Sequence, residues 1–339
     1  MRAVSPPPDG AYPNKNTAEG QDALFSLTNG TSNTANGFSA LKANTNGDRN
    51  TANGALALFT NVTGSENTAT GYAALFFNRG SWNTANGIGA LHSNATGTNN
   101  TANGQRALSD NLSGSKNTAN GSVALGNNTM GDNNTADGFQ ALGANTTGSF
   151  NIALGNNAGS GVSTADDVIC IGAVGADISH SCYIGNIFNQ SSLSGLPVFV
   201  NSDGKLGTII SSRRFKQDIK PMDKASEAIL ALQPVTFRYK RDFDPTGIEQ
   251  FGLVAEDVAK VNPDLVVRDK EGKPYSVRYD QVNAMLLNEF LKEHHQVQDL
   301  KAIVAEQQSR IDALTAGLEK VSAQVQLSKP EPQTARNIH

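Results

Sequence analysis

The chain has 339 residues, 27 Lys and Arg against 31 Asp and Glu, and a formal net charge of −4. Such a near-neutral balance, without a basic cluster, argues against nucleic acid as a partner. The charges are unevenly distributed, because residues 1–160 contain 7 basic and 8 acidic side chains while residues 211–339 contain 19 of each. The first stretch is rich in Asn, Thr, Gly and Ala instead, so the chain contains at least two unlike parts.

Several common features are missing from the sequence. The two cysteines, Cys170 and Cys182, are too few for a disulfide framework, and no Cys/His cluster suggests a metal or cofactor. Both lie in apolar, strand-like runs, which favours two buried thiols over a single bridge between neighbouring strands. No run of 18 apolar residues predicts a membrane span. The proline-rich stretch Met1–Pro13 has no apolar signal-peptide core.

A 17-residue repeat dominates the first half of the chain. The phrase Asn-Thr-Ala-x-Gly recurs at intervals of 17 residues, once 16, and a degenerate copy begins at Asn151. The eight copies begin at Asn16, Asn33, Asn50, Asn67, Asn83, Asn100, Asn117 and Asn134. Eight residues after each of these lies a leucine preceded by alanine: Leu24, Leu41, Leu58, Leu75, Leu91, Leu108, Leu125 and Leu142. A period held over so many copies indicates one structural unit stacked on itself.

The repeat is too short and too rich in glycine for two helices, so it predicts a β-solenoid with two short strands and two tight corners per coil. Glycines would form the corners, and equivalent asparagines would hydrogen-bond along the stack. One leucine and one or two alanines per coil bury little apolar area, so we expect several chains to share one apolar axis. Threonine ladders can bind ice or sugars, but a rod that displays or spaces something is favoured.

Residues 161–210 change character. Val168–Gly172 and Cys182–Asn186 read as short strands of bulkier residues that close the solenoid. Pro197–Gly207 reads as a hairpin with Ser-Asp-Gly at its turn. A solenoid needs a cap for solubility, and we expect this region to supply it.

A set of motifs after residue 210 resembles a known family. In order, they are Ser211-Ser-Arg-Arg-Phe-Lys-Gln-Asp-Ile-Lys-Pro221, Ala231-Leu-Gln-Pro-Val-Thr-Phe-Arg-Tyr-Lys240, Phe251-Gly-Leu-Val-Ala-Glu-Asp-Val258 and Tyr275-Ser-Val-Arg-Tyr-Asp-Gln-Val-Asn-Ala284. Together they make residues 205–300 similar to the endosialidase-type intramolecular chaperones. These are self-cleaving, trimer-forming domains at the C-terminus of many phage tail spikes and related bacterial surface fibres.

The resemblance implies autoproteolysis by a serine–lysine dyad. The family spacing of five residues selects Ser211 as nucleophile and Lys216 as general base, and places the scissile bond between Ile210 and Ser211. A lysine acts as a base only when neutral, so the chemistry requires burial. The family often has Asp after the serine, where this chain has Ser212. The resemblance also implies that cleavage follows trimer assembly, and we expect no activity on external substrates.

From Leu286 onward the apolar residues follow a heptad. The a positions are Phe290, Val297, Val304, Ile311, Leu318 and Val325, and the d positions are Leu286, Glu293, Leu300, Gln307, Leu314 and Val321. Five heptads without proline predict a coiled coil. The pattern alone does not separate two strands from three, and the family resemblance favours three.

The predicted fold is a mainly-β repeat solenoid, then an α+β chaperone domain and a long trimeric coiled-coil helix. The predicted parts are a disordered leader 1–14, the solenoid 15–160, a capping region 161–210, the chaperone domain 211–285, the coiled coil 286–326 and a disordered tail 327–339. We expect a homotrimeric fibre of a virion tail or bacterial surface, with a cell-surface glycan or receptor as candidate partner. The alternative is an adhesin or structural fibre whose trimerisation domain stays uncleaved.

Overall fold

The computed structural model describes residues 13–201 and 203–327. The predicted disordered leader 1–14 lies outside these ranges except for residues 13 and 14, which belong to the 3-10 turn η1 (Pro13–Lys15). The predicted disordered tail 327–339 lies outside them except for Leu327, the last residue of helix α2 (Tyr279–Leu327). The chain divides into two compact units between Leu193 and Ser194.

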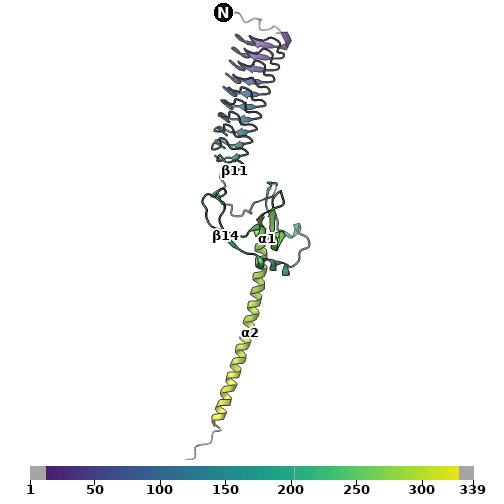
Figure 1. The fold of residues 1–339 in the computed structure, drawn as a ribbon, viewed down its shortest axis with the longest axis vertical. Helices are drawn as coiled ribbons and strands as arrows, with labels where there is room; N and C mark the ends of the chain where they lie inside the picture. The colour runs from purple at the N-terminus through teal and green to yellow at the C-terminus, as the bar shows by residue number, and fades with distance from the viewer. Residues whose placement is uncertain (1–12, 202, 328–339) are drawn as a thin grey trace, which may run out of the picture. The chain divides into compact units, whose positions relative to one another are not determined.

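The first unit is a parallel β-solenoid (Figure 1). Eleven three-residue strands stack in chain order, each parallel to the next, and the register pairs Thr17 with Thr34 and Ala18 with Ala35. The predicted solenoid and its 17-residue period are therefore confirmed. The strands are β1 Thr17–Glu19, β2 Thr34–Asn36, β3 Thr51–Asn53, β4 Thr68–Thr70, β5 Thr84–Asn86, β6 Thr101–Asn103, β7 Thr118–Asn120, β8 Thr135–Asp137, β9 Ile152–Leu154, β10 Ile169–Ile171 and β11 Cys182–Ile184.

Each coil contains one strand, where two were predicted. The rest of the coil is a succession of turns, in which non-glycine residues adopt left-handed backbone angles, such as Ser39 (φ 56°), Leu41 (φ 49°) and Arg49 (φ 52°). Left-handed angles bend the chain, so these residues cannot extend into a second strand. The predicted glycine corner is present: Gly54 has φ +138°, and a Cβ there would lie 2.6 Å from the carbonyl oxygen of Gly71.

The solenoid interior consists of stacked columns of alanine, leucine and asparagine. Six of the repeated leucines have no exposed surface: Leu41, Leu58, Leu75, Leu91, Leu108 and Leu125. The asparagines stack as predicted: the Asn50 backbone N–H donates to Asn33 Oδ1 at 2.9 Å, and Asn50 Nδ2 donates to the Gly64 carbonyl at 2.8 Å. Because one chain encloses the leucine column completely, the prediction of several chains sharing this apolar axis is wrong. Two asparagine columns fill the space that we expected neighbouring chains to fill.

The two cysteines occupy different environments. Cys170 is buried in the middle of β10 and lies opposite Tyr183, whereas Cys182 is exposed at the start of β11 and lies opposite Ile169. Both are free thiols. The prediction of two buried side chains is thus wrong for Cys182, and the alternative of a bridge between neighbouring strands is also wrong.

The second unit is a small α/β region followed by a long helix. The predicted hairpin is present as β12 (Phe199–Val200) paired antiparallel with β13 (Leu206–Gly207). The remaining elements are η2 Arg213–Phe215, η3 Asp223–Ala231, β14 Val235–Phe237, β15 Gln250–Gly252, α1 Ala255–Val261, η4 Pro263–Leu265, β16 Val266–Arg268, β17 Pro274–Val277 and α2 Tyr279–Leu327. Strand β14 pairs with β15 and β16 pairs with β17, both antiparallel. The core consists of Val258, Leu265, Val266, Val277 and Met285.

Helix α2 confirms the predicted long C-terminal helix. It is 49 residues long, and the apolar side chains at its a and d positions are between 44% and 74% exposed in the single chain. These residues are Leu286, Phe290, Val297, Leu300, Val304, Ile311, Leu314, Leu318, Val321 and Val325. No helix within residues 13–201 and 203–327 combines the length and the apolarity needed to cross a membrane.

Candidate functional site

The predicted dyad lies at a tight turn. Ser211 precedes the 3-10 turn η2 and Lys216 follows it, and the Lys216 backbone N–H donates to the Arg213 carbonyl at 3.1 Å. The Arg214 guanidinium lies over the Phe215 ring at 4.5 Å, a cation–π contact that supports the turn. The turn brings the two predicted residues together, so that Lys216 Nζ lies 3.1 Å from Ser211 Oγ.

The neighbouring Ser212 occupies a different position. Its carbonyl oxygen accepts the Phe215 backbone N–H at 3.0 Å, so its backbone forms the start of the turn. Its side chain makes no capping hydrogen bond to the turn. The described hydrogen bond of the Lys216 ammonium goes to Ser211, which agrees with the five-residue spacing.

Solvent surrounds the dyad in the single chain. Ile210, Ser211 and Lys216 are all exposed, and residues 208–212 form no helix or strand. Exposure makes the Ile210–Ser211 peptide accessible, but it also hydrates the ammonium group of Lys216. A hydrated ammonium donates its protons and does not accept one from a serine hydroxyl. The geometry of a dyad is therefore present in one chain, whereas the dry environment that a neutral lysine needs is not.

A second serine–lysine contact, which no sequence motif predicted, joins η3 to α2. Ser226 is fully buried, and its Oγ contacts Glu289, receives a hydrogen bond from Asn288 Nδ2 at 2.7 Å and lies 3.4 Å from Lys292 Nζ. Lys292 also forms an ion pair with Glu289 at 2.7 Å, which raises the pKa of the Lys292 ammonium and lowers that of the Glu289 carboxyl. A lysine held charged in this way cannot act as a base, so this cluster anchors the helix.

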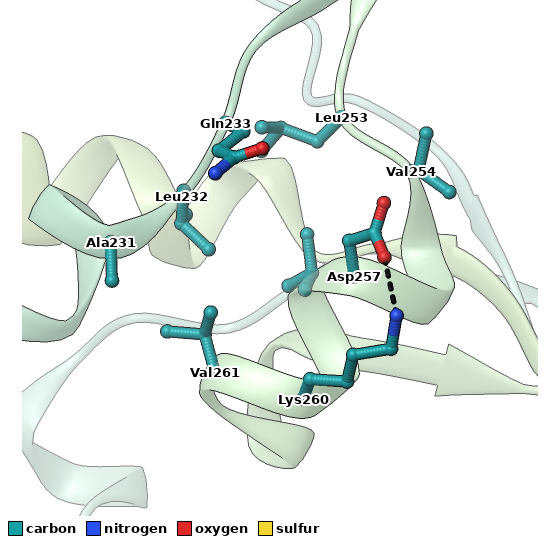
Figure 2. Close-up of a pocket in the computed structure, with 9 residues that line it drawn as sticks. Ala231, Leu232, Gln233, Leu253, Val254, Asp257, Lys260 and Val261 are labelled. Atoms are coloured by element: carbon teal, nitrogen blue, oxygen red, sulfur yellow. Dashed lines mark hydrogen bonds and ion pairs between the residues drawn. The ribbon is translucent and has the colours of Figure 1, made fainter.

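An apolar cavity of about 200 Å³ lies in the second unit, between the end of η3 and α1 (Figure 2). Leu232, Leu253 and Val261 line it, and an ion pair of 2.7 Å between Asp257 and Lys260 lies beside it. Neither dyad residue lines this cavity. In the part of the chain that the structure describes, no group of three His, Cys, Asp or Glu side chains could hold a metal ion.

The rod carries an aromatic column on its surface. The Phe76 ring stacks on Phe59 at 5.0 Å and on His92 at 5.3 Å, and burial there lowers the pKa of His92. A groove of about 310 Å³ beside the column is lined by His92 and by Tyr72, Ile88, Gln105, Arg106 and Asp110. Aromatic faces next to hydrogen-bonding side chains suit a sugar ring.

Comparisons with known proteins identify one family. Residues 211–267 match the family described as chaperone of endosialidase, and the match begins at Ser211. No curated protein and no solved structure matches the chain. Residues 211–267 are thus similar to the chaperone of endosialidase, and a β-solenoid rod precedes them in the sequence.

Proposed function

We propose that this chain is the subunit of a homotrimeric fibre whose C-terminal unit assembles three chains, assists folding of the rod and then cleaves itself off between Ile210 and Ser211. The fibre belongs to a virion tail or a bacterial cell surface. The observation that carries the proposal is the 3.1 Å contact between Lys216 Nζ and Ser211 Oγ, at the first residue of the family match.

The rod's hydrogen-bonding pattern supports a role for assistance in its folding. Strand pairs join residues 17 positions apart, as in Thr34 with Thr51, so each coil forms on the one before it. The first coil has no such template, so the entropy lost in closing it is not offset by hydrogen bonds to an earlier coil. Association through the exposed apolar face of α2 would bring three chains into register near their C-terminal ends, and growth could begin there.

The proposed cleavage is an acyl shift followed by hydrolysis. Lys216 removes the proton from the Ser211 hydroxyl, and Oγ attacks the carbonyl carbon of Ile210. The peptide C–N bond breaks while an ester C–O bond forms, and the Ser211 nitrogen takes up the proton as a free amine. Water then opens the ester, giving a carboxylate at Ile210 and restoring the hydroxyl.

Solvent exposure of the dyad supports a link between cleavage and assembly. Lys216 requires removal from water to become neutral, and the neighbouring chains of a trimer are the surfaces that would exclude water. In this proposal the single chain is inactive and the assembled trimer cuts, so that no subunit loses its chaperone before the rod has formed.

Intact mass of freshly expressed protein tests the proposal. Wild type and Ser212→Ala should each give two fragments divided at Ile210–Ser211, whereas Ser211→Ala and Lys216→Ala should remain whole chains of 35.6 kDa. Whole wild-type chains in an assembled trimer would reject the peptidase and leave the alternative, a fibre or adhesin with an uncleaved domain. One observation favours that alternative: Ser212 stands where the family often has Asp.

A glycan is the proposed partner of the rod. The groove beside the aromatic column supports this, and a glycan array probed with the intact protein tests it. Binding that is lost in Tyr72→Ala would support an adhesive rod, whereas an array without signal would leave the rod as a spacer.

A further inference from the structure

The outward face of the solenoid sheet changes its chemistry near the end of the rod. In β1 to β8 the first and third residues of each strand are polar, as in Thr118 and Asn120 of β7. The third residue is charged in the first and the last of these strands, as Glu19 and Asp137. In the last three strands the same positions hold Ile152, Leu154, Ile169, Ile171, Cys182 and Ile184. The middle residue of each strand from β1 to β10 is buried, so first and third residues point outward together.

These six residues form one continuous patch, here called the isoleucine face. The register places Ile152 beside Ile169 and Leu154 beside Ile171, and then Ile169 beside Cys182 and Ile171 beside Ile184. Its five aliphatic side chains are between 37% and 50% exposed. An apolar patch with a polar border marks an interaction surface more often than chance exposure.

We infer that the isoleucine face is where the rods of three chains meet while the C-terminal units hold those chains together. The inference rests on the proposed function. Cleavage at Ile210–Ser211 removes α2 and its whole heptad, so any contact that preserves the fibre must lie before residue 211. The isoleucine face satisfies this condition and lies in the three strands of the solenoid sheet that are nearest the cut in sequence.

Another copy of this chain is the occupant that the surface favours. The patch contains no charged side chain, so it offers nothing that would select a charged partner, and two or three copies can pack their aliphatic residues symmetrically. Its six side chains are far fewer than the roughly 20–30 residues per side of a stable independent interface. It would therefore form while the C-terminal units hold the chains together at high local concentration.

Cys182 provides a native probe of this contact. It is an exposed free thiol on the isoleucine face, while the other cysteine, Cys170, is buried. Full-length Ser211→Ala protein should give covalent dimers on treatment with a short bis-maleimide. The matched control carries Cys182→Ser and Val174→Cys, which moves the thiol to an exposed position outside the strands of the sheet. That control should give none.

A second variant tests the apolar side chains themselves. The double substitution Ile169→Thr and Ile171→Asn gives β10 the outward-facing residues of the repeat. Because both positions are exposed, we expect the rod to fold as in wild type. We expect the full chain to stay trimeric by analytical ultracentrifugation while the Cys182 cross-link is lost. An assembled wild-type trimer without any Cys182 cross-link, or one cross-linked equally through Val174→Cys, would overturn the inference. A monomeric wild type would instead reject the proposed function.

Discussion

The rod and the C-terminal unit differ in how completely a single chain buries its apolar side chains. In the rod each coil encloses its own leucine, alanines and asparagines, so the interior is complete within one chain. In the described part of the C-terminal unit five apolar residues form the buried core, while ten apolar side chains at the a and d positions of α2 are exposed to solvent. The rod's interior is thus complete within one chain, whereas the C-terminal unit leaves an apolar helix face uncovered in the single chain. A lasting fibre and a removable assembly device would differ in this way.

The largest effect is expected from charged residues introduced into the exposed apolar face of α2, where the C-terminal unit differs most from the rod. In Val304→Asp with Ile311→Asp, two adjacent a positions would place carboxylates in the proposed coiled-coil core, where burial without a partner costs several kcal/mol each. We expect loss of the trimer at micromolar concentration, measured by analytical ultracentrifugation of the full chain, and loss of cleavage with it.

Ala305→Asp is the matched control, because Ala305 is exposed on the same helix but lies outside the a and d positions. It should assemble like wild type. A trimer that survives both charged a positions would show that α2 is not the assembling element, and the C-terminal unit would then resemble the rod in being complete within one chain.

An asparagine substitution tests whether the hydrogen bonds inside each coil stabilise the rod. Asn50→Ala removes the acceptor of the Asn67 backbone N–H (3.0 Å) and one of two side-chain donors to the Gly64 carbonyl, which keeps the Asn61 Nδ2 hydrogen bond at 2.8 Å. Removing the partner of a buried N–H costs about 1–3 kcal/mol of unfolding free energy. Urea unfolding followed by fluorescence of Trp82 measures it, since this single tryptophan lies in the rod.

The control for that substitution is in the same coil. Asn53 lies on the exposed side of β3, so Asn53→Ala should change the unfolding free energy by less than about 0.5 kcal/mol. Equal losses in the two variants would mean that the ladder inside the coil contributes no more than a surface side chain.

The sequence predicted the rod because every coil repeats the same register, which aligns equivalent asparagines without further information. It did not predict the number of strands, since leucines such as Leu41 adopt left-handed angles that their residue type does not indicate. The cysteines differ by a one-residue offset: Cys170 is the middle residue of its strand and points inward, while Cys182 is the first and points outward.

The candidate site, too, could be predicted only in part from the sequence. Ser211 and Lys216 were predicted from the five-residue spacing of the family that the chain resembles, and the structure places them in contact because one short turn joins them. Their exposure was not readable, because burial depends on what the rest of the structure, or another chain, places over them. The anchor formed by Ser226 and Glu289 joins residues more than 60 positions apart, and no local pattern marks such a pair.

The smallest expected effect concerns the end of the rod and depends on pH. The Asp177 carboxylate accepts the backbone N–H groups of Ser163, Thr164 and Ala165 at 2.8 Å each, and the Ser163 and Thr164 hydroxyls at 2.8 and 2.9 Å. These donors, the backbone bonds foremost, hold the pKa of Asp177 well below its usual range. A depressed pKa stabilises the fold above the unfolded value of about 3.9 and loses that contribution as pH falls further.

Hydrogen exchange at Thr164 and Ala165, corrected for the intrinsic rate, should therefore be constant from neutral pH to about pH 4 and rise below it. Asp177→Asn should exchange faster at neutral pH and lack this rise, because its amide oxygen still accepts but carries no charge to lose. Parallel pH profiles for the two proteins would show that the Asp177 carboxylate does not stabilise the structure around Thr164 and Ala165. Different profiles would mean that a side chain of the same chain secures the rod's last coils, as expected of a rod that is complete within one chain.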